Sequence, residues 1–208
     1  MVKELQVRGV FTENCYFYID DKTHTGFIID PGAEPQKIYD TVISHGWTIE
    51  KILLTHGHFD HFGAAEYLSR MLGVPIYIYK DETRYLSDTF LNLSANSGHP
   101  ITIPHYEELN DGEFLRLGAN SEFYLKVIHT PGHTPGSVTF YAPEDGVAFV
   151  GDLFYEHRAG LTEFPGGDRD TIEDTIMVKI FTLPDYTVLL SGHSSPATVA
   201  QERKILLG

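Results

Sequence analysis

Five short apolar runs constrain the fold of this chain most, because each leads into a loop that holds histidine or aspartate. The runs cover residues 27–29, 51–54, 123–128, 147–150 and 187–190. The loops after them hold Asp30, the segment 56–61, His133, Asp152 and His193. Runs of this length between polar loops predict buried β-strands. If the strands lie side by side, their loops gather at one sheet edge, where a rigid scaffold usually presents a site.

The rest of the chain supports a layered α/β fold. Further strands are expected at residues 15–19, 74–79 and 138–141, and apolar spacing predicts helices at 35–45, 62–72, 171–181 and 197–206. Residues 81–113 show no regular period, and Asn, Ser, Gly and Pro at 96–104 indicate loops. Strands interleaved with helices predict an α/β architecture, which we expect to form one domain over residues 1–208.

Composition excludes several classes of protein. The net charge of −14, without a Lys/Arg cluster, argues against a nucleic-acid partner or a nuclease. The single cysteine, Cys15, permits no disulfide within the chain and is expected to be a buried, inert thiol. Residues 1–9 lack the apolar core of a signal peptide, and no apolar run is long enough to span a bilayer. We therefore expect a cytoplasmic protein without a membrane partner.

Eleven histidines beside one cysteine indicate a metal site built from imidazole and carboxylate. The central motif is His56-Gly57-His58-Phe59-Asp60-His61. Residues two apart in an extended segment project to the same side, so His56 and His58 can reach one ion together. Asp60 and His61 leave in another direction, toward a second ion. A shuffled chain of this composition would contain the pattern H-x-H-x-D-H about 0.002 times, so the motif is specific.

The remaining histidines and aromatic residues receive simpler interpretations. Isolated loop histidines are usually structural or exposed, which we expect for His24, His45, His99, His105 and His157. His129 ends a strand and is expected to be packed or hydrogen-bonded rather than a ligand. Most Tyr and Phe residues should be core, and the candidates to line a substrate cleft are Phe59, Phe62, Tyr155 and Phe164.

Four segments resemble, in order, the motifs of the metallo-β-lactamase superfamily. They are Thr-His-Gly-His-Phe-Asp-His at 55–61, Thr-Pro-Gly-His-Thr-Pro-Gly at 130–136, Gly-Asp at 151–152 and Gly-His at 192–193. The resemblance extends from Asn14 to about Arg203 and is strongest to the short glyoxalase II-like (hydroxyacylglutathione hydrolase-like) branch. It implies a four-layer αββα sandwich of the α/β (α+β) class, with the site in a cleft at the sheet edges.

The resemblance also implies roles for individual residues. It assigns the first metal to His56, His58 and His133, the second to Asp60, His61 and His193, and the bridging position to Asp152. Asp60 is also the candidate catalytic residue. Asp30 and Thr55 are candidates to orient a ligand imidazole, although Asp30 would equally suit a turn cap. The implied cofactors are two divalent ions, zinc first, with iron and manganese also compatible with these ligands.

The expected reaction is cleavage of a small thioester of the S-acylglutathione type by a hydroxide shared between two ions. A thiol has an unperturbed pKa of about 8.5 and can depart as a thiolate, whereas an amine needs a proton donor, and no acid beyond Asp60 is evident. The alternatives are a persulfide dioxygenase with a single iron, a lactonase, or a metal-binding module without catalysis. Two departures leave the use of glutathione open. We expect no C-terminal glutathione-binding helical domain, and Leu161 stands where related short members often carry arginine. The oligomeric state is also open.

Overall fold

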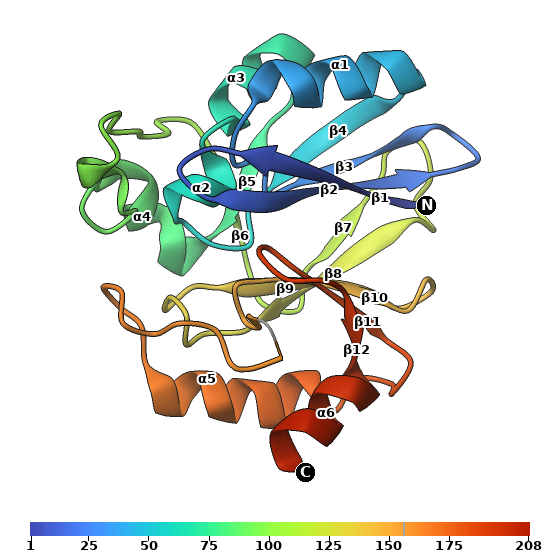
Figure 1. Cartoon of the computed structure of the whole chain (residues 1–208). Coiled ribbons are helices and arrows are strands. Elements are labelled where there is room, and N and C mark those ends of the chain that lie inside the picture. The colour runs from blue at the N-terminus through green and yellow to red at the C-terminus, as the bar shows by residue number, and fades with distance from the viewer. Residues whose placement is uncertain (156) are drawn as a thin grey trace.

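Two six-stranded sheets pack face to face between two layers of helices in the structure, a computed structural model that describes residues 1–155 and 157–208 (Figure 1). The first sheet has the order β1 (Val2–Arg8), β2 (Thr12–Asp20), β3 (Thr25–Ile29), β4 (Thr48–Leu53), β5 (Ile76–Tyr79), β6 (Glu107–Leu109). The second has the order β12 (Ala197–Thr198), β11 (Val188–Ser191), β10 (Val147–Gly151), β9 (Val138–Ala142), β8 (Tyr124–His129), β7 (Phe114–Arg116). The expected αββα sandwich is confirmed.

Helices cover the outer face of each sheet. Helices α1 (Pro35–His45) and α3 (Ala65–Leu72) lie on the first sheet, and α5 (Arg169–Thr175) and α6 (Val199–Leu207) lie on the second (Figure 1). Pro35 opens α1 and Gly46 closes it at φ 65°, where its N–H bonds to the carbonyls of Val42 and Ile43. Proline at the start and glycine just past the end are the favoured terminal residues of a helix. None of the described helices is both long and apolar enough to cross a bilayer.

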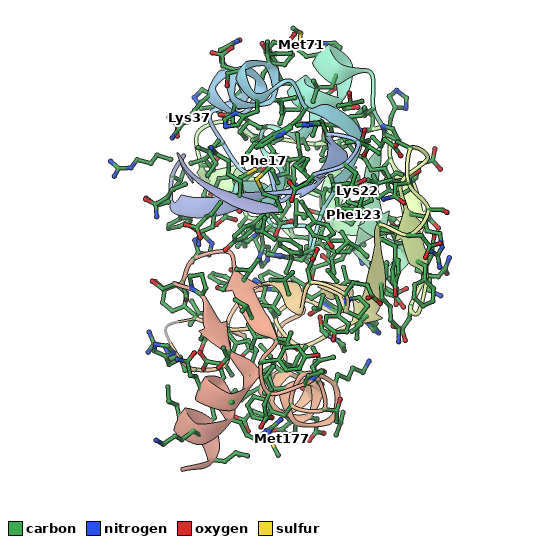
Figure 2. All side chains as sticks on the ribbon, turned by 90° about the vertical axis from the view of Figure 1, so that its right-hand side faces the viewer. Phe17, Lys22, Lys37, Met71, Phe123 and Met177 are labelled. Atoms are coloured by element: carbon green, nitrogen blue, oxygen red, sulfur yellow. The ribbon has the colours of Figure 1, made fainter. Side chains whose placement is uncertain are left out.

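Alternation along the strands divides the core into three layers. On β2, Phe17 faces the helices, whereas Tyr16 and Tyr18 face the second sheet. On β4, Ile52 packs with the helix-side layer and Leu53 with the layer between the sheets. Because both faces of β2 and of the Ile52–Leu53 end of β4 are buried, these stretches read in sequence as continuous apolar runs. Figure 2 shows Phe17 inside the upper half, with the exposed Met71 and Met177 at opposite ends of the molecule.

The expected single helix over residues 62–72 is wrong, because the structure contains a short α2 (Phe59–Phe62) and a separate α3. The break lies at Gly63 and Ala64, where the Ala64 N–H bonds to the Pro31 carbonyl at 2.9 Å. The loop after β3 approaches so closely that a Cβ on Gly32 would lie 1.6 Å from the Asp60 carbonyl oxygen. The turn carrying Asp60 and His61 is therefore set by contact with a distant loop rather than by helical spacing.

Other elements were not expected from the sequence. The stretch 81–113 contains α4 (Thr83–Ser87) and β6, with 3₁₀ turns η1 (Lys80–Glu82) and η2 (Ser94–Asn96). The helix expected at 171–181 continues from α5 into a π-helical turn, η3 (Ile176–Ile180), and the helix expected at 197–206 is preceded by β12. Strands β1 and β7 are short or half-exposed edge elements, whose pairing with a neighbouring strand decides their conformation.

Candidate metal centre

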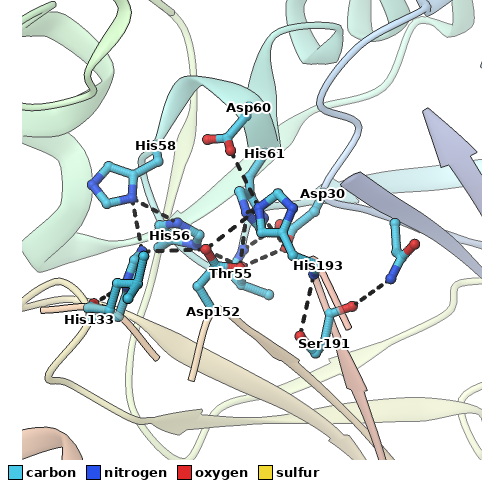
Figure 3. A network of polar contacts seen from close by, with 12 residues as sticks. Asp30, Thr55, His56, His58, Asp60, His61, His133, Asp152, Ser191 and His193 are labelled. Atoms are coloured by element: carbon cyan, nitrogen blue, oxygen red, sulfur yellow. Dashed lines mark hydrogen bonds and ion pairs between the residues drawn. The ribbon is translucent and has the colours of Figure 1, made fainter. Parts of the chain in front are cut away.

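The seven predicted ligands converge at one edge of the two sheets. The loop after β4 carries His56 and His58, and α2 carries Asp60 and His61. From the second sheet, the loops after β8, β10 and β11 carry His133, Asp152 and His193. Figure 3 shows all seven side chains directed toward a common centre. Loops from two sheets therefore build one site, as the positions of the apolar runs predict.

The first group consists of His56, His58 and His133. The Nε2 of His56 lies 3.1 Å from the Nδ1 of His58, and the same Nδ1 lies 2.9 Å from the Nε2 of His133. All three side chains are buried. The three nitrogens are thus close enough to bind one ion, and His58 presents a different ring nitrogen from the other two.

The second group consists of Asp60, His61 and His193. The Nε2 of His61 lies 3.3 Å from the Nε2 of His193, which lies 3.4 Å from Asp60 Oδ2. Asp152 stands between the groups. Its Oδ1 lies 3.2 Å from His61 Nε2, and its Oδ2 lies 3.7 Å from His133 Nε2. Each carboxylate oxygen of Asp152 thus lies within 4 Å of a ring nitrogen of a different group.

The backbone contacts of His133 and His193 fix which nitrogen of each neutral ring faces the centre. The Nδ1 of His133 lies 2.6 Å from the Leu161 carbonyl oxygen, and the Nδ1 of His193 lies 2.7 Å from the Thr12 carbonyl oxygen. A carbonyl only accepts, so each Nδ1 carries the proton and donates it. In the neutral ring the inward Nε2 is then an unprotonated lone pair. Several lone pairs pointing at each other from about 3 Å fit a cation between them, so this donor set suits a divalent metal.

The two groups differ in the proton affinity of their histidines. Burial, reinforced by the neighbouring imidazoles, lowers the pKa of His56 well below its usual value and that of His58 to about 3. Burial also lowers the pKa of His133. For His61 and His193, burial acts in the same direction but nearby carboxylates, Asp152 foremost, outweigh it and raise both pKa values.

Asp30 and Thr55 form the support beneath this centre. The Oδ1 of Asp30 accepts the Thr55 N–H at 2.7 Å, and its Oδ2 accepts the Thr55 hydroxyl at 2.6 Å and the Nδ1–H of His61 at 3.0 Å. The Thr55 hydroxyl oxygen in turn lies 3.1 Å from Nδ1 of His56. One buried carboxylate therefore fixes a ring of each group, which favours the orienting role over a simple turn cap.

An Asp30→Asn substitution is expected to weaken metal binding at the second group by about 10–100-fold, the usual loss when such a supporting partner is changed. Asparagine cannot accept from the Thr55 N–H and the His61 Nδ1–H on separate oxygens, so one N–H would face its amide. Competition with a chelator measures the affinity. Asp20→Asn is the matched control, because Asp20 is also a buried carboxylate accepting a backbone N–H and a hydroxyl, and it lies outside the centre. Unchanged affinity in Asp30→Asn contradicts the orienting role.

Two buried carboxyl groups, those of Glu82 and Glu13, were not predicted from the sequence. Glu82 accepts the N–H of Gly57 and of Gly136, both at 2.8 Å, and so ties the loop before His58 to the loop after His133. Burial raises the Glu82 pKa to about 7. Glu13 is buried with no hydrogen-bond partner among the described residues, and burial raises its pKa well above the usual value. No local pattern marks either residue, because the burial of both and the hydrogen bonds of Glu82 depend on segments distant in the chain.

The start of β2 positions the loop that ends in His193. The Asn14 side chain donates to the carbonyls of Ser191 and Ser194 at 3.1 and 3.2 Å, and the Tyr16 hydroxyl donates to that of Ser191 at 2.7 Å. A Cβ on Gly192 would lie 2.4 Å from His61 Cε1, so only glycine fits before His193. The two ends of the chain thus jointly set the second group.

A cavity of about 380 Å³ opens beside the centre and is lined by Phe11, Thr12, Asp60, Asp152, Tyr155, Leu161, Phe164 and His193. Two expected cleft residues, Tyr155 and Phe164, lie in this lining. Phe59 lines an adjacent cavity. The expectation for Phe62 is wrong, because this side chain is fully buried in the helix-side core. No lysine or arginine lies among the described lining residues.

The histidines outside the centre behave as expected. His24, His45, His99, His105 and His157 are all exposed. His129 stacks on Tyr79 and its Nε2 lies 2.8 Å from the Pro135 carbonyl oxygen, which accounts for it without a metal. Cys15 is buried, as expected for an inert thiol.

Comparison with known proteins gives consistent similarities. The model of the Metallo-beta-lactamase superfamily matches residues 8–193. Hydroxyacylglutathione hydrolase GloC of Haemophilus influenzae is 34% identical over 93% of this chain and 91% of its own. The structure of the BLEG-1 B3 metallo-beta-lactamase superposes with a TM-score of 0.91 at 34% identity, over 98% of this chain and 97% of the other. The di-iron-bound form of TTHA1623 gives 0.84 at 30% identity, over 98% of both chains.

Proposed function

Because the chain belongs to the metallo-beta-lactamase superfamily, we propose that it is a metal-dependent hydrolase that cleaves a small thioester of the S-acylglutathione type. One observation carries the proposal: inward-facing imidazole nitrogens and two carboxylates converge beside an open cavity that no described lysine or arginine lines. The name of the Haemophilus influenzae relative supports the thioester class. The di-iron relative supports a pair of ions.

The residues present suit zinc, iron or manganese, with His56, His58 and His133 holding one ion and Asp60, His61 and His193 holding the other. Asp152 lies where it would contact both. Divalent ions there would supply an ionised water at neutral pH and polarise a carbonyl group. The protein contributes orientation, since the Nδ1–H bonds of His133 and His193 to backbone carbonyls fix both rings.

The cavity lining favours a leaving group that departs without a proton donor. Apart from the proposed ligands, the described part of the lining consists of Phe11, Thr12, Tyr155, Leu161 and Phe164, none of which is a carboxylic acid or a lysine. A thiol with a pKa of about 8.5 leaves readily as a thiolate, whereas the amine of an amide or lactam needs protonation. Thioester hydrolysis is therefore the reaction that least requires a proton donor in the lining of this cavity.

Elemental analysis of the purified protein, paired with a substrate panel, tests the proposal. We expect about two metal equivalents, as a two-ion site requires, and hydrolysis of S-lactoylglutathione with a higher kcat/KM than of an acyl-homoserine lactone or a chromogenic β-lactam. The β-lactam belongs in the panel because the BLEG-1 structure is named a metallo-beta-lactamase.

Each other outcome replaces the proposal with a specific alternative. One iron per chain, with oxygen uptake on glutathione persulfide, identifies a dioxygenase instead. Preference for the lactone or the lactam identifies that hydrolase class. Two bound metals without turnover on any ester, thioester, lactone or lactam leave a metal-binding module.

A further inference from the structure

A second cavity, of about 340 Å³, adjoins the one beside the metal centre. Its apolar lining includes Val10, Phe11, Phe59, Phe90, Leu93 and Phe164, and no charged residue lies among its described lining. Phe11 and Phe164 also line the first cavity, so the two spaces meet at these rings. Four segments far apart in the sequence build it: the β1–β2 turn, the start of α2 at Phe59, the loop around η2, and the loop that contains Phe164.

Phe164 links this apolar space directly to the reactive centre. Its ring centroid lies 5.5 Å from that of His58 and 6.2 Å from that of His133. Phe59 lies between His58 and Asp60 in sequence and faces the second cavity. A substrate whose carbonyl sits at the metal centre would therefore reach the second cavity past Phe164.

Large apolar side chains at this cavity are unusually exposed. Val10 is 60% exposed, Phe11 56% and Phe90 67%. Contiguous exposed apolar residues rimming a cavity mark a binding site rather than ordinary surface. Since the cavity continues from the proposed catalytic centre, its natural occupant is a part of the substrate.

We propose that the second cavity binds the hydrocarbon chain of the acyl group of the thioester, and that the protein prefers apolar acyl groups. This inference rests on the proposed function. The thiol halves of common thioesters carry charges, which an uncharged apolar cavity cannot solvate. The acyl half is the part that can be wholly apolar. In the reaction, water adds its oxygen to the carbonyl carbon, the C–S bond breaks, and a water proton passes to the departing sulfur. The products are the carboxylic acid and the thiol.

A chain-length series tests this assignment while the thiol stays constant. The substrates are the acetyl, butyryl, hexanoyl and octanoyl thioesters of N-acetylcysteamine, an uncharged thiol, and the enzyme is metal-loaded. We expect kcat/KM to rise along the series by up to about fourfold per methylene group, the effect of burying one CH₂. A flat or falling series, with the acetyl ester hydrolysed, contradicts the acyl subsite and leaves the thioesterase function intact.

Two variants test whether the preference for long acyl chains arises at the second cavity. Phe90→Ala removes a wall of the second cavity, and Ala95→Trp fills it; neither residue lines the first cavity. Each should lower the octanoyl-to-acetyl ratio of kcat/KM about tenfold. Phe114→Ala is the matched control, because Phe114 is 48% exposed on β7 and lines neither cavity. An unchanged ratio in both test variants, or an equal change in the control, overturns the assignment.

A binding measurement separates failure of this inference from failure of the proposed function. N-octanoyl-N′-acetylethylenediamine has the structure of the octanoyl substrate with N–H in place of the ester sulfur. As an amide it hydrolyses far more slowly, and its affinity for the metal-loaded protein is measurable by calorimetry. We expect Phe90→Ala to weaken its binding about tenfold and Phe114→Ala to leave it unchanged. Binding without hydrolysis of any thioester refutes the thioesterase and keeps the apolar subsite; no binding difference between the variants refutes the subsite.

Discussion

Replacing Asp152 by alanine is expected to abolish turnover and reduce the metal content of the protein. Among the described carboxylates, Asp152 alone lies within 4 Å of ring nitrogens of both histidine groups, at 3.2 Å from His61 Nε2 and 3.7 Å from His133 Nε2. Without it, the positive charge of two ions loses a shared counter-charge. We expect kcat/KM to fall by at least about 10³-fold, as when one member of a catalytic unit is removed. Elemental analysis should find fewer than two metal equivalents.

Two further variants test whether the loss comes from the charge of Asp152 and from its position in the centre. Asp152→Asn preserves the shape of the side chain but not its charge, so it should show the same loss if charge is the cause. Asp21→Ala removes an exposed carboxylate, 70% accessible and remote from the centre, and should retain full activity and metal. Full activity in Asp152→Ala would falsify the assignment of this site.

Acidification from pH 8 to pH 6 is expected to release metal from the Asp60–His61–His193 group before the group of three histidines. The pKa values of His61 and His193 are raised, because carboxylates outweigh burial, so a bound proton must leave each ring before metal can bind. Affinity at this group should fall by up to about 100-fold per pH unit, tenfold for each protonated histidine.

The group of His56, His58 and His133 should keep its metal between pH 8 and pH 6. The pKa values of His56, His58 and His133 are lowered, chiefly by burial, and that of His58 is about 3. Lowered pKa values disfavour a second proton on these rings, so acidification should displace their metal less readily than that of the other group. Equilibrium dialysis with elemental analysis at each pH should show two separate losses. Simultaneous loss of both ions, or earlier loss from the first group, contradicts the separation.

A control variant tests whether the histidines of the centre, rather than other histidines, cause the two metal losses. His99→Gln removes an exposed histidine far from the centre in sequence, and both metal transitions should stay where they are. The Asp30→Asn variant should shift the earlier transition more than the later one, because Asp30 Oδ2 accepts the His61 Nδ1–H directly and reaches His56 only through the Thr55 hydroxyl.

Sequence reasoning predicted the elements whose local pattern is strong. The helix at Pro35–His45 begins at a proline and ends at Gly46, and its predicted bounds agree with the structure. The strands that precede Asp30 and Asp152 were recognisable because burial on both faces makes them continuous apolar runs. Elements that depend on a neighbour for their conformation, such as β1 and the break between α2 and α3, carry no such pattern.

By itself, the sequence determined which chemistry the chain carries: the spacing of His56, His58, Asp60 and His61, and one histidine or aspartate in each of three later loops. These are local properties, because ligand type and strand-to-loop order are written in neighbouring residues. Only the tertiary structure decided which ring nitrogen is free, since Leu161, Thr12 and Asp30 reach the ligands from distant segments. The roles of Glu82 and the apolar cavity at Phe90 likewise arise only when separate loops meet, because hydrogen bonds and packing act through space rather than along the chain.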